Sequence, residues 1–165
     1  MISTKNFLEI QKLEKPKLDV SSLQFATLPY TVESKGHTRE FVPTKIASAI
    51  AGAYVDFLLL QNAALEVTDP AHLTVINDLT LKVLTELPRS ADQGGLSADT
   101  IHDIVITVLT QFNPDLGECY AFFRAIKLNK EQTITNLRVI RRNNQVVMYD
   151  ESKIQAAISS AFSHR

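Results

Sequence analysis

Two lysines of the chain occupy the same place in a repeated pattern. Lys45 opens Lys-Ile-x-x-Ala-Ile-x-x-Ala and Tyr54 follows; the same order recurs from Lys153, with Phe162 in place of the tyrosine. Each lysine would be the third residue of a helix, where its charge opposes the positive end of the helix dipole. Because helix N-termini bind phosphate readily, the placement fits an anion site. A solvated lysine lying over its own helix is the alternative, and the residues alone leave both open.

The repeat also predicts the elements that position these lysines. The two copies are 108 residues apart, and the offset holds upstream without a gap, where Phe41 corresponds to Tyr149 and Val32 to Ile140. Strand-like runs around a turn with glycine predict a β-hairpin before Pro43, and residues 139–149 predict a second one. Proline suits the first helical position, so a helix should run from about residue 43 to 64, with Val42 as its N-cap.

Three further helices should follow the first. Asp69-Pro70 opens one that ends before Pro88, and Ser97 caps the next, which ends before Asn113-Pro114. Another begins after that break. We therefore expect an α+β fold, a small four-helix bundle capped by a β-hairpin or short three-stranded sheet, followed by a second hairpin–helix unit. Residues 1–28 are expected to form a loosely ordered leader with one or two helical turns.

Composition narrows the function classes. The 165 residues carry 17 basic and 18 acidic side chains, a net charge of −1, which gives no general electrostatic case for nucleic acid or an anionic membrane. A single cysteine, Cys119, excludes an internal disulfide and zinc sites built on paired cysteines. The N-terminus has no apolar core of a secretory signal, and Ser48 and Asp56 interrupt the most apolar stretch. These features predict a cytoplasmic protein without a membrane or nucleic-acid partner.

The order of these pieces resembles a known regulatory module. A hairpin, then Lys-Ile-x-x-Ala-Ile-x-x-Ala, then a small bundle whose third helix starts Ser-x-x-x-Ile-His (Ser97 to His102) is similar to the ATP-cone. This is the allosteric nucleotide-binding region found at the N-terminus of ribonucleotide reductase large subunits. The resemblance implies a leader at 1–28, a first cone at 29–132 and the start of a second at 133–165. The rest of the second cone is expected beyond Arg165 or on a partner chain, because the apolar stripe of its helix needs a cover.

The resemblance also implies which residues bind the nucleotide. The family uses a Val-x-Lys-Arg-x-Gly hairpin, the lysine of the first helix, the histidine of the third and basic residues late in the fourth. In the first copy, Glu33 and Ser34 stand where the family has Lys-Arg. The residues implied as nucleotide-binding are Phe41, Lys45, Ile46, His102, Ile126, Lys127 and Lys130 of the first copy, and Arg141, Arg142 and Lys153 of the second.

The function implied is regulation rather than catalysis. Cones of this kind bind ATP or dATP, here expected with Mg²⁺, and control overall reductase activity through changes in oligomeric state. The implied partners are the remainder of a ribonucleoside-diphosphate reductase chain, its other subunit and further copies of the chain. No catalytic set and no metal-ligand set is predicted within this stretch. Two alternatives stay open: a degenerate cone with only a structural or oligomerisation role, and the cone of a transcriptional regulator, whose paired zinc-type cysteines the chain lacks.

Overall fold

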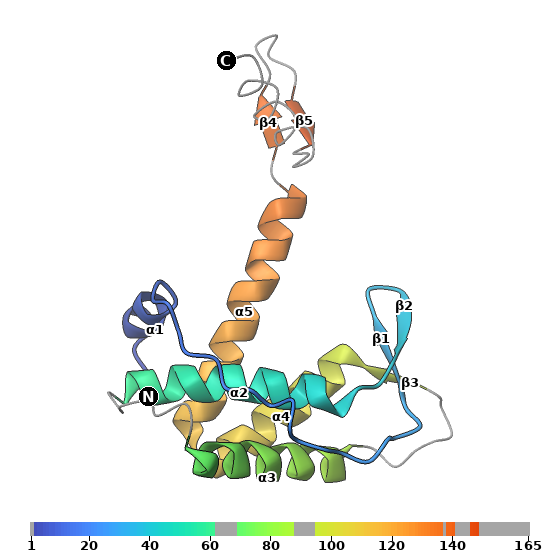
Figure 1. Ribbon diagram of the computed structural model, residues 1–165. Helices are drawn as coiled ribbons and strands as arrows, with labels where there is room; N and C mark the ends of the chain where they lie inside the picture. Colours follow the sequence, from blue (N-terminus) through green and yellow to red (C-terminus); the bar gives the residue numbers. More distant parts are fainter. Residues whose placement is uncertain (1, 62–68, 88–94, 137, 141–145, 149–165) are drawn as a thin grey trace, which may run out of the picture. The chain divides into compact units, whose positions relative to one another are not determined.

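The chain forms two compact units, residues 1–123 and 124–165. The computed structural model describes residues 2–61, 69–87, 95–136, 138–140 and 146–148 (Figure 1). Within these residues the fold is mixed α+β, as expected from the sequence. Helices α1 (Thr4–Ile10), α2 (Pro43–Leu60), α3 (Pro70–Glu86) and α4 (Ala98–Phe112) belong to the first unit, together with the beginning of α5 (Pro114–Asn136).

A small sheet lies at the end of the first unit where α2 and α4 begin (Figure 1). It consists of β1 (Thr31–Ser34), β2 (His37–Glu40) and β3 (Gly95–Ser97), in the order β2-β1-β3. Strands β1 and β2 form the expected hairpin, and β3 pairs with β1 in parallel. The turn is two residues long, Lys35 and Gly36, with φ of 52° and 76°, the left-handed conformation that tight hairpin turns need.

The helix starts follow from the capping residues predicted. Val42 is the N-cap of α2, with Pro43 in the first turn. The Asp69 carboxylate accepts the Ala71 N–H at 2.9 Å at the start of α3, and Ser97 Oγ accepts the Thr100 N–H at 3.0 Å at the start of α4. Helix α2 ends at Leu60, and residues 62–64 of the expected helix lie outside the described residues.

The core of the first unit lies between α2, α3, α4 and the start of α5. Figure 1 shows α2 and α3 running side by side, and α3 also contacts α4. Each helix contributes its apolar face. The side chains with an exposed fraction of 1% or less include Ile50, Ile76, Val83, Val105, Leu109, Leu116 and Cys119.

The leader, expected to be loosely ordered with one or two helical turns, contains the seven-residue helix α1 and packs onto this core. Phe7 of α1 is 1% exposed, and Leu18 and Val20 are buried as well. Lys15 Nζ lies 2.6 Å from Asp56 Oδ1 on α2, in a pair whose side chains are 24% and 3% exposed. The pattern of residues 1–28 was too short and irregular to show this packing, which depends on a partner surface far along the chain.

Helix α2 is long and apolar enough to cross a membrane by length and composition, the single such helix in the described part of the chain. Eight of its residues are buried within the first unit, among them Asp56. Its apolar side therefore has a cover inside the protein, as expected for a core helix.

The second unit contains the later part of α5 and the hairpin of β4 (Arg138–Ile140) and β5 (Val146–Met148). The two strands pair antiparallel, with Val139 opposite Val147, as the repeat predicts in outline. The register differs from that of the first copy by one residue, because the equivalent of Glu40 is Met148, which pairs with Arg138 instead of Val139. The expected N-cap Asp150 and the helix after it lie outside the described residues.

Candidate functional site

The starts of α2 and α4 meet the sheet at one end of the first unit. Strand β2 ends at Glu40 and α2 begins at Pro43, while β3 leads into α4 without a gap. Both β1 and β3 contact α4. Ile46, which follows Lys45, and Ile101, which precedes His102, belong to the same buried core. The fold therefore anchors both helix starts beside the sheet.

Lys45 lies in the first turn of α2, and its side chain is exposed. No side chain caps this helix start, because the N-cap residue is Val42, and the first turn holds no acidic residue. The positive end of the helix dipole therefore receives no compensation from an acidic side chain of that turn. A lysine added to such a start produces a local excess of positive charge that suits an anion.

His102 on α4 is held by α5. Its Nδ1 lies 2.7 Å from the hydroxyl oxygen of Tyr120, which is 3% exposed, and the two rings have centroids 5.9 Å apart. The imidazole is half-buried. A hydrogen bond between one ring nitrogen and a buried hydroxyl fixes the orientation of the ring, and with it the direction of the second nitrogen.

Phe41 and Ile46 lie inside the core and present little surface to a ligand. They are 4% and 7% exposed, and the Phe41 ring packs edge-on against Tyr30 with a centroid distance of 6.1 Å. Their role in the described structure is to fix the link between β2 and α2. They thereby position Lys45.

The strand register separates the charged residues of the hairpin onto two faces. Val32 and Leu96 pair across β1 and β3 and pack on the core, so they mark the face that turns toward the helices. Arg39 is directly opposite Val32 on β2, and cross-strand partners share a face. Glu33, one residue on from Val32, must lie on the other face. The Glu33 carboxylate therefore points away from the core.

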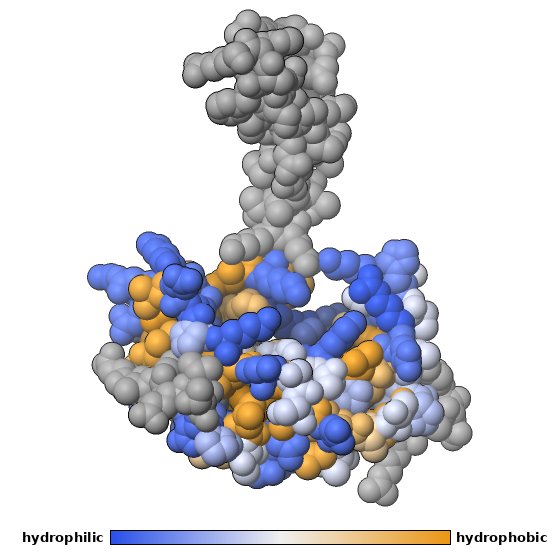
Figure 2. Space-filling model, in the orientation of Figure 1, coloured by the Kyte–Doolittle hydropathy of each residue, from blue (hydrophilic) through white to orange (hydrophobic). Residues whose placement is uncertain are grey.

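Arg39 was missed by the sequence reasoning. It does not belong to the expected motif, and its relation to Val32 depends on the two-residue turn and the pairing that follows from it. Its side chain is exposed on the outer strand of the sheet, in a hairpin that is mostly hydrophilic on the visible face of Figure 2. Alternation along the two strands was the signal available in the sequence.

The remaining predicted residues belong to the second unit or lie outside the described part. Ile126 is half-buried and Lys127 exposed on α5, and Lys130 lies on the same helix. All three fall in the second unit. Arg141, Arg142 and Lys153 lie outside the described residues.

Burial rather than catalysis explains the shifted pKa values in the core. Burial raises the pKa of the Cys119 thiol to about 12, with Asp56 as the next contributor. Burial also raises the pKa of Tyr54, whose hydroxyl lies 3.2 Å from His72 Nδ1. A thiol that stays protonated at neutral pH is a packing residue and not a nucleophile.

Among known proteins, no protein-family model matches the chain, and no curated protein matches it significantly. A function for this chain therefore has to be inferred from its own residues and their arrangement.

Proposed function

We propose that the first unit is a nucleotide-binding regulatory module of the ATP-cone kind, which binds ATP or dATP with Mg²⁺. The observation that carries the proposal is the arrangement at the sheet end of the unit. A hairpin runs directly into a helix start that bears Lys45, and the start of α4, with His102, lies at the same end. The order of these elements is also the order of the sequence pattern that resembles the family.

The chemistry at this end suits a polyphosphate. The start of α2 lacks a side-chain cap and acidic residues, and Lys45 adds a cation to it. Arg39 adds a second cation from the helix-facing side of the hairpin. Arginine offers paired donors that match phosphate oxygens, and lysine acts as a point charge. Glu33 lies on the other face of β1, so it does not face a phosphate bound on the helix side.

The regulatory part of the proposal concerns two ligands that differ by one hydroxyl. ATP and dATP share the triphosphate and the base, so they regulate differently only if the 2′-hydroxyl changes the relative affinity for two assemblies. The partners proposed are the remainder of a ribonucleotide reductase chain, its other subunit and further copies of this chain, in the cytoplasm. Nucleotide binding would then set overall reductase activity by changing the oligomer.

Calorimetric titration of the chain with dATP, ATP and GTP tests the proposal. We expect saturable dATP binding that Lys45→Ala weakens at least tenfold, since a hydrogen bond to a charged group contributes about 1.5–3 kcal/mol. Lys82→Ala is the matched control, because Lys82 is an exposed lysine on α3. Equal loss in both variants, or binding that Lys45→Ala leaves unchanged, would contradict a site at the start of α2.

A second candidate function rests on the hairpin sequence. Glu33 and Ser34 stand in place of the two basic residues that the family uses. A degenerate cone that no longer binds a nucleotide, but keeps the surface for contacts with other chains, would serve as a structural or oligomerisation module. Absence of heat with every nucleotide, together with concentration-dependent self-association in analytical ultracentrifugation, would favour this function over the first.

A further inference from the structure

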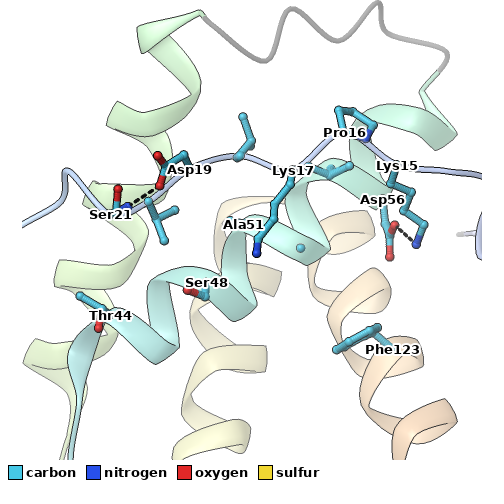
Figure 3. A pocket seen from close by; sticks show the side chains of 14 residues that line it. Lys15, Pro16, Lys17, Asp19, Ser21, Thr44, Ser48, Ala51, Asp56 and Phe123 are labelled. Carbon is cyan, nitrogen blue, oxygen red and sulfur yellow. Dashed lines mark hydrogen bonds and ion pairs between the residues drawn. The ribbon is translucent and has the colours of Figure 1, made fainter.

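An open groove runs along α2 in the first unit, from Thr44 in the first turn of the helix to Asp56 near its other end. It lies between α2 and the strap, which we define as residues 15–21 of the leader, and Phe123 of α5 also lines it. Its volume is about 890 Å³, which falls within the range of small-molecule sites. Figure 3 shows the strap crossing above α2, with Lys15 beside Asp56 and Thr44 toward the other end of the groove.

The floor of the groove is apolar and is widened by a glycine. Ala51 and Val55 are 4% and 3% exposed, and Phe123 offers a ring that is 44% exposed. Gly52 stands between Ala51 and Val55 in the middle of α2, where glycine weakens a helix. A Cβ built on Gly52 would meet nothing within 4 Å. The packing of the described chain therefore does not require glycine here, and its absent side chain leaves room above the helix.

The polar groups of the groove include two donors near its middle, one ion pair at one end and a carboxylate at its edge. The Lys17 side chain extends from the strap toward α2 at the level of Ala51 (Figure 3). Within the described residues it forms no hydrogen bond or ion pair. The hydroxyl of Ser48 lies on the same stretch of α2. Lys15 is neutralised by Asp56, at 2.6 Å.

A carboxylate at the edge of the groove limits the charge that a ligand can carry. Asp19 Oδ1 accepts the Ser21 N–H at 2.9 Å, and hydrogen bonds from Ser21 hold the pKa of Asp19 below its usual value. Asp19 therefore stays ionised next to Lys17. Because Lys15 is paired with Asp56, Lys17 is the lysine of the groove that can match a ligand, and it matches a single negative charge, while Asp19 repels a second one.

We propose that this groove binds a small amphiphilic carboxylate. Its apolar body would lie on the floor of Ala51, Gly52 and Val55 against Phe123, and its carboxylate would accept hydrogen bonds from Lys17 and Ser48. The apolar floor of this site begins at Ala51, beyond the first turn of α2 that carries Lys45, and its ligand differs from the polyphosphate proposed for that turn.

Amide NMR of the full chain with decanoate as the probe tests the site, with 1-decanol as the neutral match. Decanoate should shift the amide signals of Gly52 and Ala51 saturably and bind at least fivefold more tightly than decanol. Gly52→Phe fills the open space above the helix and should abolish the shifts at the neighbouring amides. Lys17→Met should make decanoate and decanol bind equally, while Lys12→Met, an exposed lysine outside the groove, should change nothing.

Two outcomes would overturn the site. One is a response to decanoate that does not saturate, and the other is binding that survives both Gly52→Phe and Lys17→Met. Lys17 is exposed, so Lys17→Met tests the site even if Gly52→Phe fails to fold. Lys45→Ala separates the two proposals, because it should weaken dATP binding and leave decanoate binding intact.

Discussion

Lys45 and His102 are positioned in different ways, and the difference bears on how each would act on a ligand. Lys45 is exposed on the first turn of a helix and keeps the freedom of a long side chain. His102 is half-buried, and Tyr120 holds its ring at 2.7 Å. A flexible cation adapts to a phosphate, whereas an oriented imidazole discriminates between groups by geometry. Of the two residues, His102 is therefore the better candidate for distinguishing ligands by the position of their sugar or phosphate groups.

Substitution of Arg39 should change the affinity for dATP. Because it shares the helix-facing side of the hairpin with Val32, Arg39→Ala should weaken dATP binding at least tenfold, the loss of about one charge-assisted hydrogen bond. Thr38→Ala is the control, since Thr38 pairs with Glu33 on the opposite face. Calorimetry measures both variants. A larger effect of Thr38→Ala than of Arg39→Ala would show that the ligand lies on the other face.

Cys119 gives a prediction for pH dependence. Burial raises its folded-state pKa to about 12, above a value of about 8.5 for the unfolded chain. The unfolded chain loses the thiol proton first, so this contribution to stability is complete below pH of about 8.5 and is lost as the pH rises toward 12. Iodoacetamide at pH 8 should alkylate the folded protein at least ~100-fold more slowly than the urea-unfolded chain. Rates within tenfold of each other would contradict the burial.

At the scale of the elements, the sequence predicted what depends on local signals. Pro43, Asp69 and Ser97 marked helix starts that the structure has at the same residues, since caps act on the adjacent turn. The packing of the leader was not predictable, because its partners are more than 40 positions away in the sequence. Phe7 packs against Phe122, and Lys15 pairs with Asp56. The same holds for the face of Arg39, which depends on strand pairing.

The two glycines of α2 and α5 should respond in opposite ways to the same substitution. Gly117 lies where α5 crosses α4, and a Cβ there would come within 2.9 Å of the Thr110 backbone. Gly117→Ala should lower the free energy of unfolding by about 2 kcal/mol. Gly52→Ala should raise it by about 0.5–1 kcal/mol, because nothing stands near its Cβ and alanine favours the helix. Urea unfolding followed by circular dichroism measures both, and equal signs would contradict the packing described.

The connection between the strap and α2 gives a third stability prediction. Among the described residues, Lys15→Met leaves the Asp56 carboxylate, 3% exposed, with the Gln11 amide at 3.0 Å as its remaining partner. Loss of a buried partner is costly, but Lys15 is 24% exposed, so we expect a decrease of about 2 kcal/mol in the free energy of unfolding. Lys12→Met should stay within about 0.5 kcal/mol of the parent. Unchanged stability of Lys15→Met in urea would show that the leader does not brace the core.

At the scale of the whole molecule, the near-zero net charge conceals an uneven distribution. Basic side chains stand at the start of α2 and on the helix side of the first hairpin. In the second copy of the pattern Lys153 corresponds to Lys45, whereas Arg141 and Arg142 stand at the positions of Glu33 and Ser34. The 108-residue repeat predicted the second hairpin correctly. A hairpin depends on pairing between strands that are close in sequence, so a local pattern is enough to indicate it. The second helix pattern, from Lys153, lies outside the described residues.

We propose a nucleotide site at the start of α2, with the hairpin and α4 beside it. Titration of the chain with dATP in a calorimeter tests it most directly. We expect saturable binding that Lys45→Ala weakens at least tenfold and that Lys82→Ala leaves unchanged. Absence of heat with dATP and ATP alike, from a chain that is folded by circular dichroism, would contradict it.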